Sequence, residues 1–193
     1  MKQFSPQKKP KPSKNLKHKK KREKAQAAKK QRELEIAKER LNAGPSPRQL
    51  EIQRITELYL MEKKLTLREI PADGNCLYRA IASQCQNGVD YKAVRKTCAE
   101  VLTKHNEEFS PFAEIETTYE KYVENVALSS EWGGHLELRA LAMGLKRPIV
   151  VYSADAPPLV MREEFQDEEE IRLSFYRYYY ALGEHYNSVV PIQ

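Results

Sequence analysis

The chain has 193 residues and a formal net charge of +6, and 40% of its residues are hydrophobic. This length allows one ordinary domain with an appendage, and the hydrophobic content excludes a chain that is disordered throughout. Three cysteines cannot all pair and none has zinc-ligand spacing, which excludes a disulfide scaffold and a zinc module. With no apolar run of about 18 residues and no signal-peptide pattern, we expect no membrane partner and a cytoplasmic location, with a nuclear one also open.

Charge is distributed unevenly along the chain. Residues 1–48 contain 17 basic and 4 acidic residues, whereas residues 49–193 contain 16 basic and 23 acidic residues. The basic character therefore belongs to the N-terminal part, whose expected partner is a polyanion. RNA is the first expectation, and a nuclear localisation signal at residues 19–22 is the alternative.

The N-terminal part divides into three segments. Residues 1–15 combine prolines and lysines with almost no apolar content, so we predict a disordered basic tail. Strong helix formers dominate the next segment, which predicts a basic helical extension over residues 16–46 that ends at a Gly and Pro cluster. Residues 47–63 are more apolar and predict a joining helix that could pack on the domain that follows.

The remaining residues alternate between strand and helix patterns. Residues 65–70 predict a strand, and helices are expected from Cys76 to about residue 86, after Asp90, and over residues 114–128 and 136–145. Strands follow at residues 148–152, 171–180 and 185–190. Strands at both ends with helices between them predict an α/β or α+β domain built of packed layers.

A cysteine stands where the predicted turn at residues 71–75 meets an apolar helix. In the first turn of a helix, unpaired backbone N–H groups and the positive end of the helix dipole favour a thiolate. We therefore predict that Cys76 is a nucleophile with a lowered pKa, and that the same amides can bind an oxyanion.

A nucleophilic thiol needs a base, and the chain has four histidines. His18 lies in the basic tail, and we interpret His105, at a helix end, and His135, after a turn, as structural. His185 stands at the start of a predicted strand, with Asn187 two residues later on the same face. An Asn oxygen that accepts from one ring nitrogen would leave the other nitrogen facing the thiol, as in Cys-His-Asn triads. A purely structural role for His185 would be favoured only if this segment stood alone.

Three segments together resemble the OTU (ovarian tumour) family of cysteine-protease deubiquitinases. They are DGNCLYR at residues 73–79, WGGHLEL at residues 132–138 and GEHYNSV at residues 183–189. The similarity covers roughly residues 64–191, and the basic N-terminus resembles the branch of OTU-domain-containing protein 6, including fungal relatives. The resemblance implies a papain-like catalytic domain over residues 64–193, with a small central sheet flanked by helices.

The resemblance also implies roles for individual residues. Cys76 would be the nucleophile, His185 the general base and Asn187 the residue that orients it. Asp73 would belong to the active site and shape the oxyanion loop, although a turn-forming role accounts for it equally well. The segment around Trp132 would support the site, and no metal or cofactor is implied.

The implied substrate is ubiquitin or a ubiquitinated protein, cleaved at an isopeptide bond through a thioester acyl-enzyme. The resemblance further implies ribosome association, so a ribosomal subunit or its RNA would bind residues 1–48, and we expect a monomer. Six aromatic residues could line a substrate channel, but such a stripe is more typical of a core: Tyr78, Trp132, Tyr178, Tyr179, Tyr180 and Tyr186. The alternatives are a catalytically silent ubiquitin- or ribosome-binding adaptor of the same fold, which the intact Cys76, His185 and Asn187 disfavour, and a plain RNA-binding module.

Overall fold

The computed structural model describes residues 14–42, 44–86, 88–113, 118–180 and 183–192. The chain divides into two compact units, residues 1–44 and residues 45–193. The first unit contains helix α1 (Lys14–Asn42), whose described side chains are all exposed, as expected for a sequence with few apolar residues. The tail predicted over residues 1–15 falls mostly on residues 1–13, outside the described residues. Among the described helices, none has the length and apolar character needed to cross a membrane.

The second unit begins with helix α2 (Pro47–Ile55), which continues into a π-helical turn, η1 (Thr56–Leu60). Ser46 starts the helix through a capping box: Gln49 N donates to Ser46 Oγ at 3.3 Å, and Ser46 N donates to Gln49 Oε1 at 2.8 Å. Ile55 and Leu60 are buried against the sheet. The segment predicted as a joining helix thus packs within the second unit.

A five-stranded mixed sheet forms the centre of this unit, with the strand order β1-β5-β4-β2-β3. Strands β2 and β4 are parallel, and the other neighbouring pairs are antiparallel. The strands are β1 (Leu65–Arg68), β2 (Ile149–Ser153), β3 (Leu159–Met161), β4 (Ile171–Tyr180) and β5 (Gly183–Pro191). Strand β1 delivers the chain to the turn before Cys76, and β5 carries His185.

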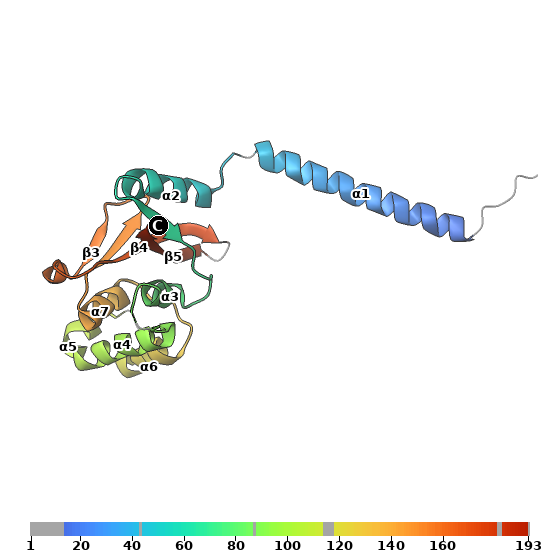
Figure 1. Ribbon diagram of the computed structural model, residues 1–193. Coiled ribbons are helices and arrows are strands. Elements are labelled where there is room, and N and C mark those ends of the chain that lie inside the picture. Colours follow the sequence, from blue (N-terminus) through green and yellow to red (C-terminus); the bar gives the residue numbers. More distant parts are fainter. Residues whose placement is uncertain (1–13, 43, 87, 114–117, 181–182, 193) are drawn as a thin grey trace, which may run out of the picture. The chain divides into compact units, whose positions relative to one another are not determined.

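Helices cover both faces of the sheet. Figure 1 shows α2 on one side and the other helices of the unit on the opposite side. These are α3 (Cys76–Ala82), α4 (Tyr91–Lys104), α5 (Asn106–Phe109), α6 (Tyr119–Leu128) and α7 (His135–Leu145), with short 3-10 turns η2 (Ser110–Phe112) and η3 (Glu163–Phe165). Alternate residues of β2 serve the two faces: Ile149 and Val151 join the larger core with α3, α4, α6 and α7, whereas Val150 and Tyr152 join the smaller core under α2.

The predicted α/β class with a central sheet and flanking helices is confirmed, with local differences. Helix α3 ends at Ala82 rather than near residue 86, because the backbone hydrogen bonds then tighten to a three-residue spacing: Gln84 N donates to Ile81 O and Cys85 N to Ala82 O. The helix predicted from residue 114 begins at Tyr119, and positions 114–117 lie outside the described residues. The short edge strand β3 was missed, since three residues are too few for a periodic pattern.

Candidate active site

Cys76 is the first residue of helix α3, directly after the N-cap Asn75. Its backbone N–H donates to Asp73 O at 3.2 Å, which closes the preceding turn. The side chain is buried, with 6% exposure, and the backbone of Tyr186 is near enough to the thiol to favour its ionised form. Because Tyr186 follows His185 directly, the thiol lies beside the strand that carries the predicted base.

The prediction of a lowered thiol pKa was wrong for this structure. Burial raises the pKa of the Cys76 thiol above its ordinary value, and the negative charge of Asp73 adds to the rise. Hydrogen bonding from the backbones of Tyr186 and Leu77 acts in the opposite direction without outweighing the burial. The backbone groups at the helix N-terminus therefore lower the pKa of the thiol, but too little to overcome the effect of burial.

Asp73 holds the turn and the helix together. Its Oδ1 accepts from Asn75 N at 2.9 Å, and its Oδ2 accepts from Arg79 Nε at 3.0 Å. Partial burial raises the pKa of the Asp73 carboxyl, but hydrogen bonds from Arg79 and Asn75 outweigh it and leave the pKa lowered. Asp73 is thus an ionised residue that stabilises the loop before Cys76. This is compatible with both predicted roles, forming the turn and shaping the oxyanion loop.

His185 and Asn187 come together as their spacing predicts. The imidazole Nε2 lies 3.0 Å from Asn187 Oδ1, and the same oxygen accepts from Ile70 N at 2.8 Å. A backbone N–H can only donate, so the contact with Ile70 fixes which end of the amide is oxygen, and that oxygen requires the proton of the imidazole on Nε2. The arrangement leaves Nδ1 as the basic nitrogen of a neutral imidazole.

The imidazole is buried, with 2% exposure, and it stacks on Tyr179 with ring centroids 4.7 Å apart. Burial lowers the pKa of His185. Asn187 and the backbone of Ile70 raise this pKa, as does Glu69, whereas the nearby Arg48 lowers it further. The raised pKa of the thiol and the lowered pKa of the imidazole together favour a neutral resting pair over a thiolate–imidazolium pair.

A buried arginine that the sequence interpretation did not single out connects the cysteine loop to the core. Arg95 on α4 is 2% exposed, and its guanidinium lies 3.9 Å from the centre of the Tyr78 ring. It donates hydrogen bonds of 2.6–2.9 Å to four acceptors: Gly74 O, Asn75 Oδ1, Val126 O and Glu131 O. A single side chain therefore ties residues 74–75, next to the thiol, to the loop that leads to Trp132.

Two glycines allow the loops around the site to approach each other closely. A Cβ on Gly74 would lie 1.5 Å from Ser130 O, and a Cβ on Gly133 would lie 2.5 Å from a methyl group of Leu77. The buried Glu137 fixes the second loop, because its Oε2 accepts from Gly134 N at 2.6 Å and its Oε1 accepts from the hydroxyl of Tyr122. The supporting role predicted for the Trp132 segment is consistent with this packing.

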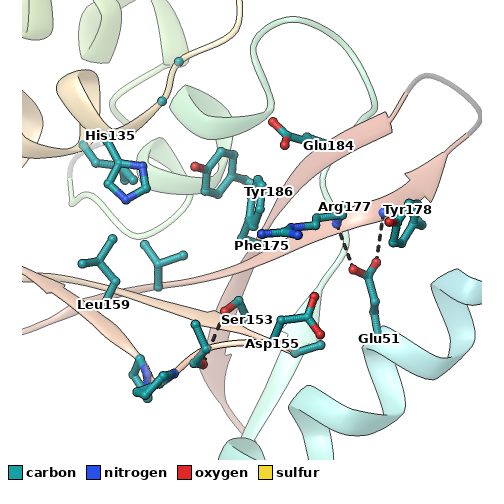
Figure 2. A pocket seen from close by; sticks show the side chains of 18 residues that line it. Glu51, His135, Ser153, Asp155, Leu159, Phe175, Arg177, Tyr178, Glu184 and Tyr186 are labelled. Atoms are coloured by element: carbon teal, nitrogen blue, oxygen red, sulfur yellow. Dashed lines mark hydrogen bonds between the residues drawn. The ribbon is translucent and has the colours of Figure 1, made fainter. Parts of the chain in front are cut away.

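Two adjoining hollows open beside these residues. A pocket of about 70 Å³ is lined by the cysteine loop, Trp132 and the start of β5: Ala72, Asp73, Gly74, Trp132, Gly183, Glu184 and His185. A groove of about 800 Å³ continues past Glu184 between α7, β4 and the segment after β2. Figure 2 shows His135, Glu184, Tyr186 and Phe175 around this groove.

The other residues considered in the sequence take different places. His105 caps the end of α4, and His135 is an exposed residue at the start of α7 that lines the groove. Of the aromatic residues, Tyr78 is core and Trp132 and Tyr178 are more than half exposed, while Tyr179 covers His185. The side chains of His18 and Tyr180 lie outside what the structure describes. Within the described residues, no cluster of three or more His, Cys, Asp or Glu could hold a metal ion.

The remaining cysteines differ from Cys76 in their surroundings. Cys98 is fully buried in the core, and burial raises the pKa of its thiol well above the ordinary value. Cys85 is half-buried, and burial raises its pKa as well. All three are free thiols, and the backbone of Tyr186, the residue after His185, acts on the pKa of Cys76.

Comparison with known proteins gives a consistent picture. The family model described as OTU-like cysteine protease matches residues 71–186. The chain is 36% identical over 192 residues to "Deubiquitinase OTUD6B" of Homo sapiens, a match that covers 94% of this chain and 65% of that protein. The chain therefore spans less than two thirds of the length of this relative.

Solved structures share the fold. The "Structure of OTUD1 OTU domain" superposes with a TM-score of 0.60 at 23% identity, covering 75% of this chain and 97% of that one. The "Structure of Ovarian Tumor (OTU) domain in complex with Ubiquitin" gives a TM-score of 0.51 at 21% identity, covering 65% and 69% of the two chains. At these identities the likeness concerns the fold alone.

Proposed function

Because the chain belongs to the OTU-like cysteine protease family, we propose that it is a thiol-dependent deubiquitinase that hydrolyses isopeptide bonds at the ubiquitin C-terminus. One observation carries the proposal: Cys76 opens a helix beside the strand on which Asn187 orients His185. The relative of Homo sapiens is named a deubiquitinase, and one OTU structure holds ubiquitin.

The proposed reaction proceeds through an acyl-enzyme. His185 Nδ1 takes the proton of the Cys76 thiol as the sulfur attacks the carbonyl carbon of the C-terminal glycine of ubiquitin. The resulting oxyanion is stabilised by backbone amides of the loop that Asp73 and Arg95 hold. His185 then returns the proton to the departing lysine amine, which leaves a thioester. Water, deprotonated by His185, hydrolyses that thioester and restores the thiol.

Neutral resting groups suit this sequence of proton transfers. The buried imidazole with a lowered pKa is unprotonated near neutral pH, so it is available as a base. The buried thiol with a raised pKa keeps its proton until substrate arrives. The enzyme would therefore act by general-base activation of Cys76 and not from a standing ion pair.

The hollows beside the site suit a flexible, glycine-ended peptide tail. The pocket of about 70 Å³ in front of His185 leaves little room for bulky side chains beside the scissile bond, and the ubiquitin tail ends in two glycines. The groove of about 800 Å³ continues from Glu184 and can take the residues that precede them. We assign the first to the reacting glycines and the second to the rest of the tail.

Hydrolysis of a fluorophore amide of ubiquitin tests the proposal. Wild-type chain should release the fluorophore, while Cys76→Ala and His185→Ala should both be inactive and still folded by circular dichroism. Cys98→Ala, which changes a thiol outside the site, serves as the matched control and should retain activity. Release that survives in Cys76→Ala, or that is absent from the wild type, would overturn the proposal.

The basic first unit has a separate proposed role, binding to a ribosomal subunit through its RNA. Helix α1 carries exposed lysines and arginines, and residues 1–48 hold 17 basic residues against 4 acidic ones. Arg48 is one of these 17, but it lies in the second unit and pairs with Glu69, so the proposed RNA contacts belong to residues 1–44. A cytoplasmic or nuclear location is part of the same proposal, since the nucleophilic thiol must stay reduced.

Charge neutralisation in the full chain tests this role. Replacing Lys19, Lys20 and Lys21 by Gln should weaken binding to purified ribosomal subunits and reduce the slope of log affinity against log salt concentration by about 0.7 per lost phosphate contact. Hydrolysis of the free fluorophore substrate should not change. An affinity and a salt slope equal to those of the wild type would contradict RNA binding by this segment.

A further inference from the structure

Strand β4 contains an irregularity next to the proposed active site. It pairs with β5 at Tyr176↔His185 and again at Tyr180↔Gly183, so three residues of β4 lie opposite the single residue Glu184. Such a bulge leaves backbone groups without ladder partners and re-aims the side chains that follow. The N–H groups of Arg177 and Tyr178 instead donate to the two carboxylate oxygens of Glu51, each at 3.0 Å.

Glu51 belongs to helix α2, and its carboxylate is nearly buried. Figure 2 shows it reaching from the helix to the strand with both hydrogen bonds drawn. Two amides in the bulge are therefore satisfied by a side chain from outside the sheet. Without that carboxylate, the amides of Arg177 and Tyr178 would lose the partners that hold the bulge in this shape.

Tyr179 is the third residue of the bulge, and its ring covers the imidazole of His185. The two rings are nearly parallel, with 20° between their planes and 4.7 Å between their centroids, and Tyr179 is 3% exposed. Asn187 fixes the imidazole from its edge through Nε2, whereas Tyr179 limits its movement out of the ring plane. Together these two contacts restrict the orientation of the imidazole.

Arg48, one turn before Glu51 on the same face of α2, contacts the ring of Tyr179. Its guanidinium lies 3.9 Å from the centre of the tyrosine ring. Glu69 Oε1 accepts from both Arg48 Nη2 and the Tyr179 hydroxyl, each at 2.9 Å. The three side chains form a closed triangle, and Ile70, the residue after Glu69, donates its N–H to Asn187.

We propose that Arg48 and Glu51 of helix α2 are positioning residues of the active site, which hold Tyr179 against His185 and thereby fix the orientation of its imidazole. The expected effect on kcat rests on the proposed function, whereas the positions of Arg48, Glu51 and Tyr179 around His185 follow from the contacts described above. Helix α2 lies entirely outside residues 71–186, which the family model matches. In this chain, a helix outside the region that the family model matches thus supports the catalytic histidine.

The physical reason for an effect on rate is orientation. An imidazole held only at one edge can tilt, and a proton transfer loses efficiency steeply when donor and acceptor are misaligned. Arg48 and Glu51 contact neither the thiol nor the imidazole by hydrogen bonding in any described contact, and they act through Tyr179 and β4. Arg48, unlike Glu51, does not line the groove assigned to the ubiquitin tail. Losing Arg48 should therefore lower kcat while leaving KM for ubiquitin nearly unchanged.

The test compares five variants of the full chain in the hydrolysis of a fluorophore amide of ubiquitin. Tyr179→Leu removes the stacked ring and should lower kcat by about tenfold or more, whereas Tyr179→Phe keeps the ring and should stay within about threefold of wild type. Arg48→Ala should lower kcat by about fivefold, and Arg48→Lys, which retains a cation over the ring, should recover part of that loss. Arg54→Ala is the matched control and should have the kcat of the wild type. Arg54 is an exposed arginine on the same helix, and its described ion pair is with the exposed Asp155.

A second readout does not depend on ubiquitin. The rate at which iodoacetamide alkylates Cys76, followed by peptide mass spectrometry across pH, should fall in Tyr179→Leu and Arg48→Ala by factors similar to those in kcat. The charged groups around the imidazole in these profiles are Arg48 and Glu69, with Asp73 and Glu184 in the adjoining pocket.

The outcomes separate this inference from the proposed function. If the wild type fails to hydrolyse the ubiquitin amide but Cys76 alkylation still falls in both variants, the proposed substrate is wrong and the positioning role stands. If kcat and alkylation in Tyr179→Leu and Arg48→Ala equal those of Arg54→Ala, or if the losses lie only in KM, the positioning role is wrong. Unfolding curves of Arg48→Ala, whose side chain is partly exposed, guard against a loss caused by misfolding.

Discussion

Two arginines of the second unit each lie 3.9 Å from the centre of a tyrosine ring, and they contact opposite halves of the proposed active site. Arg95 holds the cysteine half from within the core, is 2% exposed, and donates to four acceptors in three segments. Arg48 holds the histidine half from α2, its side chain is 34% exposed, and its described ion pair is with Glu69. The cysteine half is therefore built into the folding of the domain, while the histidine half depends on a peripheral helix that can be perturbed separately.

Replacing Arg95 should produce the largest effect and should act on stability. Arg95→Met would leave Gly74 O, Asn75 Oδ1, Val126 O and Glu131 O without their donor, and we expect the free energy of unfolding to fall by about 3–5 kcal/mol. Urea unfolding followed by circular dichroism measures this loss. Arg95→Lys should recover only part of it, because an ammonium group cannot reach all four acceptors. A loss below about 1 kcal/mol in Arg95→Met would contradict the assignment of Arg95 to the core.

Replacing Asn187 should act mainly on catalysis, because this residue joins the two halves through Ile70 and His185. Asn187→Ala removes the acceptor for both N–H groups, so the imidazole loses its fixed tautomer, and we expect kcat to fall about ten- to a hundredfold. Steady-state hydrolysis of the ubiquitin amide measures the change. Ser188→Ala, which changes the neighbouring residue on the opposite face of β5, is the control. Equal kcat values for Asn187→Ala and Ser188→Ala would argue against an orienting role.

The pH dependence of Cys76 alkylation should reveal a neutral resting pair. Burial raises the pKa of the thiol and lowers the pKa of His185. As the pH falls, the imidazole therefore stays unprotonated until the pH is below the ordinary pKa of histidine. As the pH rises, the thiolate forms only in the alkaline range. The alkylation rate at Cys76 should therefore keep rising between about pH 7 and pH 10, because most of the thiol is still protonated at neutral pH. A rate that is already constant from about pH 6 to pH 9 would indicate a standing thiolate–imidazolium pair instead.

The smallest expected effect is that of Arg48 on stability, and it sharpens the contrast with Arg95. Arg48→Ala removes one partly exposed ion pair and one contact with an aromatic face, so the free energy of unfolding should fall by no more than about 1.5 kcal/mol. The same urea titration used for Arg95 measures it. A loss as large as that of Arg95→Met would mean that both halves of the site are equally part of the folding core, and the comparison would fail.

The cysteine and histidine segments could be found from the sequence because each is a short, local pattern. The turn before Cys76 is formed by fewer than ten consecutive residues, and so is the His-x-Asn spacing on one strand face. The strand and helix periods around these two segments predicted most strands of the sheet and most helices of the layer that covers it. The pKa of Cys76 could not be predicted in the same way, because burial by the surrounding fold outweighs the helix terminus.

The residues that support those segments could not be found because their contacts are remote in sequence and their roles depend on irregular structure. Glu51 accepts hydrogen bonds from backbone amides 126 and 127 positions away, and these amides are available only because of a bulge that no periodic sequence pattern predicts. Arg48 was counted with the basic N-terminal segment on charge alone, although it faces a tyrosine of the second unit. In the sequence, Arg95 is indistinguishable from the other polar residues of an amphipathic helix. Its role depends on the carbonyl groups that the fold places around it.

The central claim, that Cys76 is the nucleophile toward the ubiquitin C-terminus, is tested most directly by intact-mass measurement after reaction with a ubiquitin C-terminal electrophile. The wild-type chain should gain the mass of one ubiquitin, with the adduct mapped to Cys76, and Cys76→Ala should gain none although Cys85 and Cys98 remain. An adduct on Cys85 or Cys98, or equal labelling of the wild type and Cys76→Ala, would contradict the account.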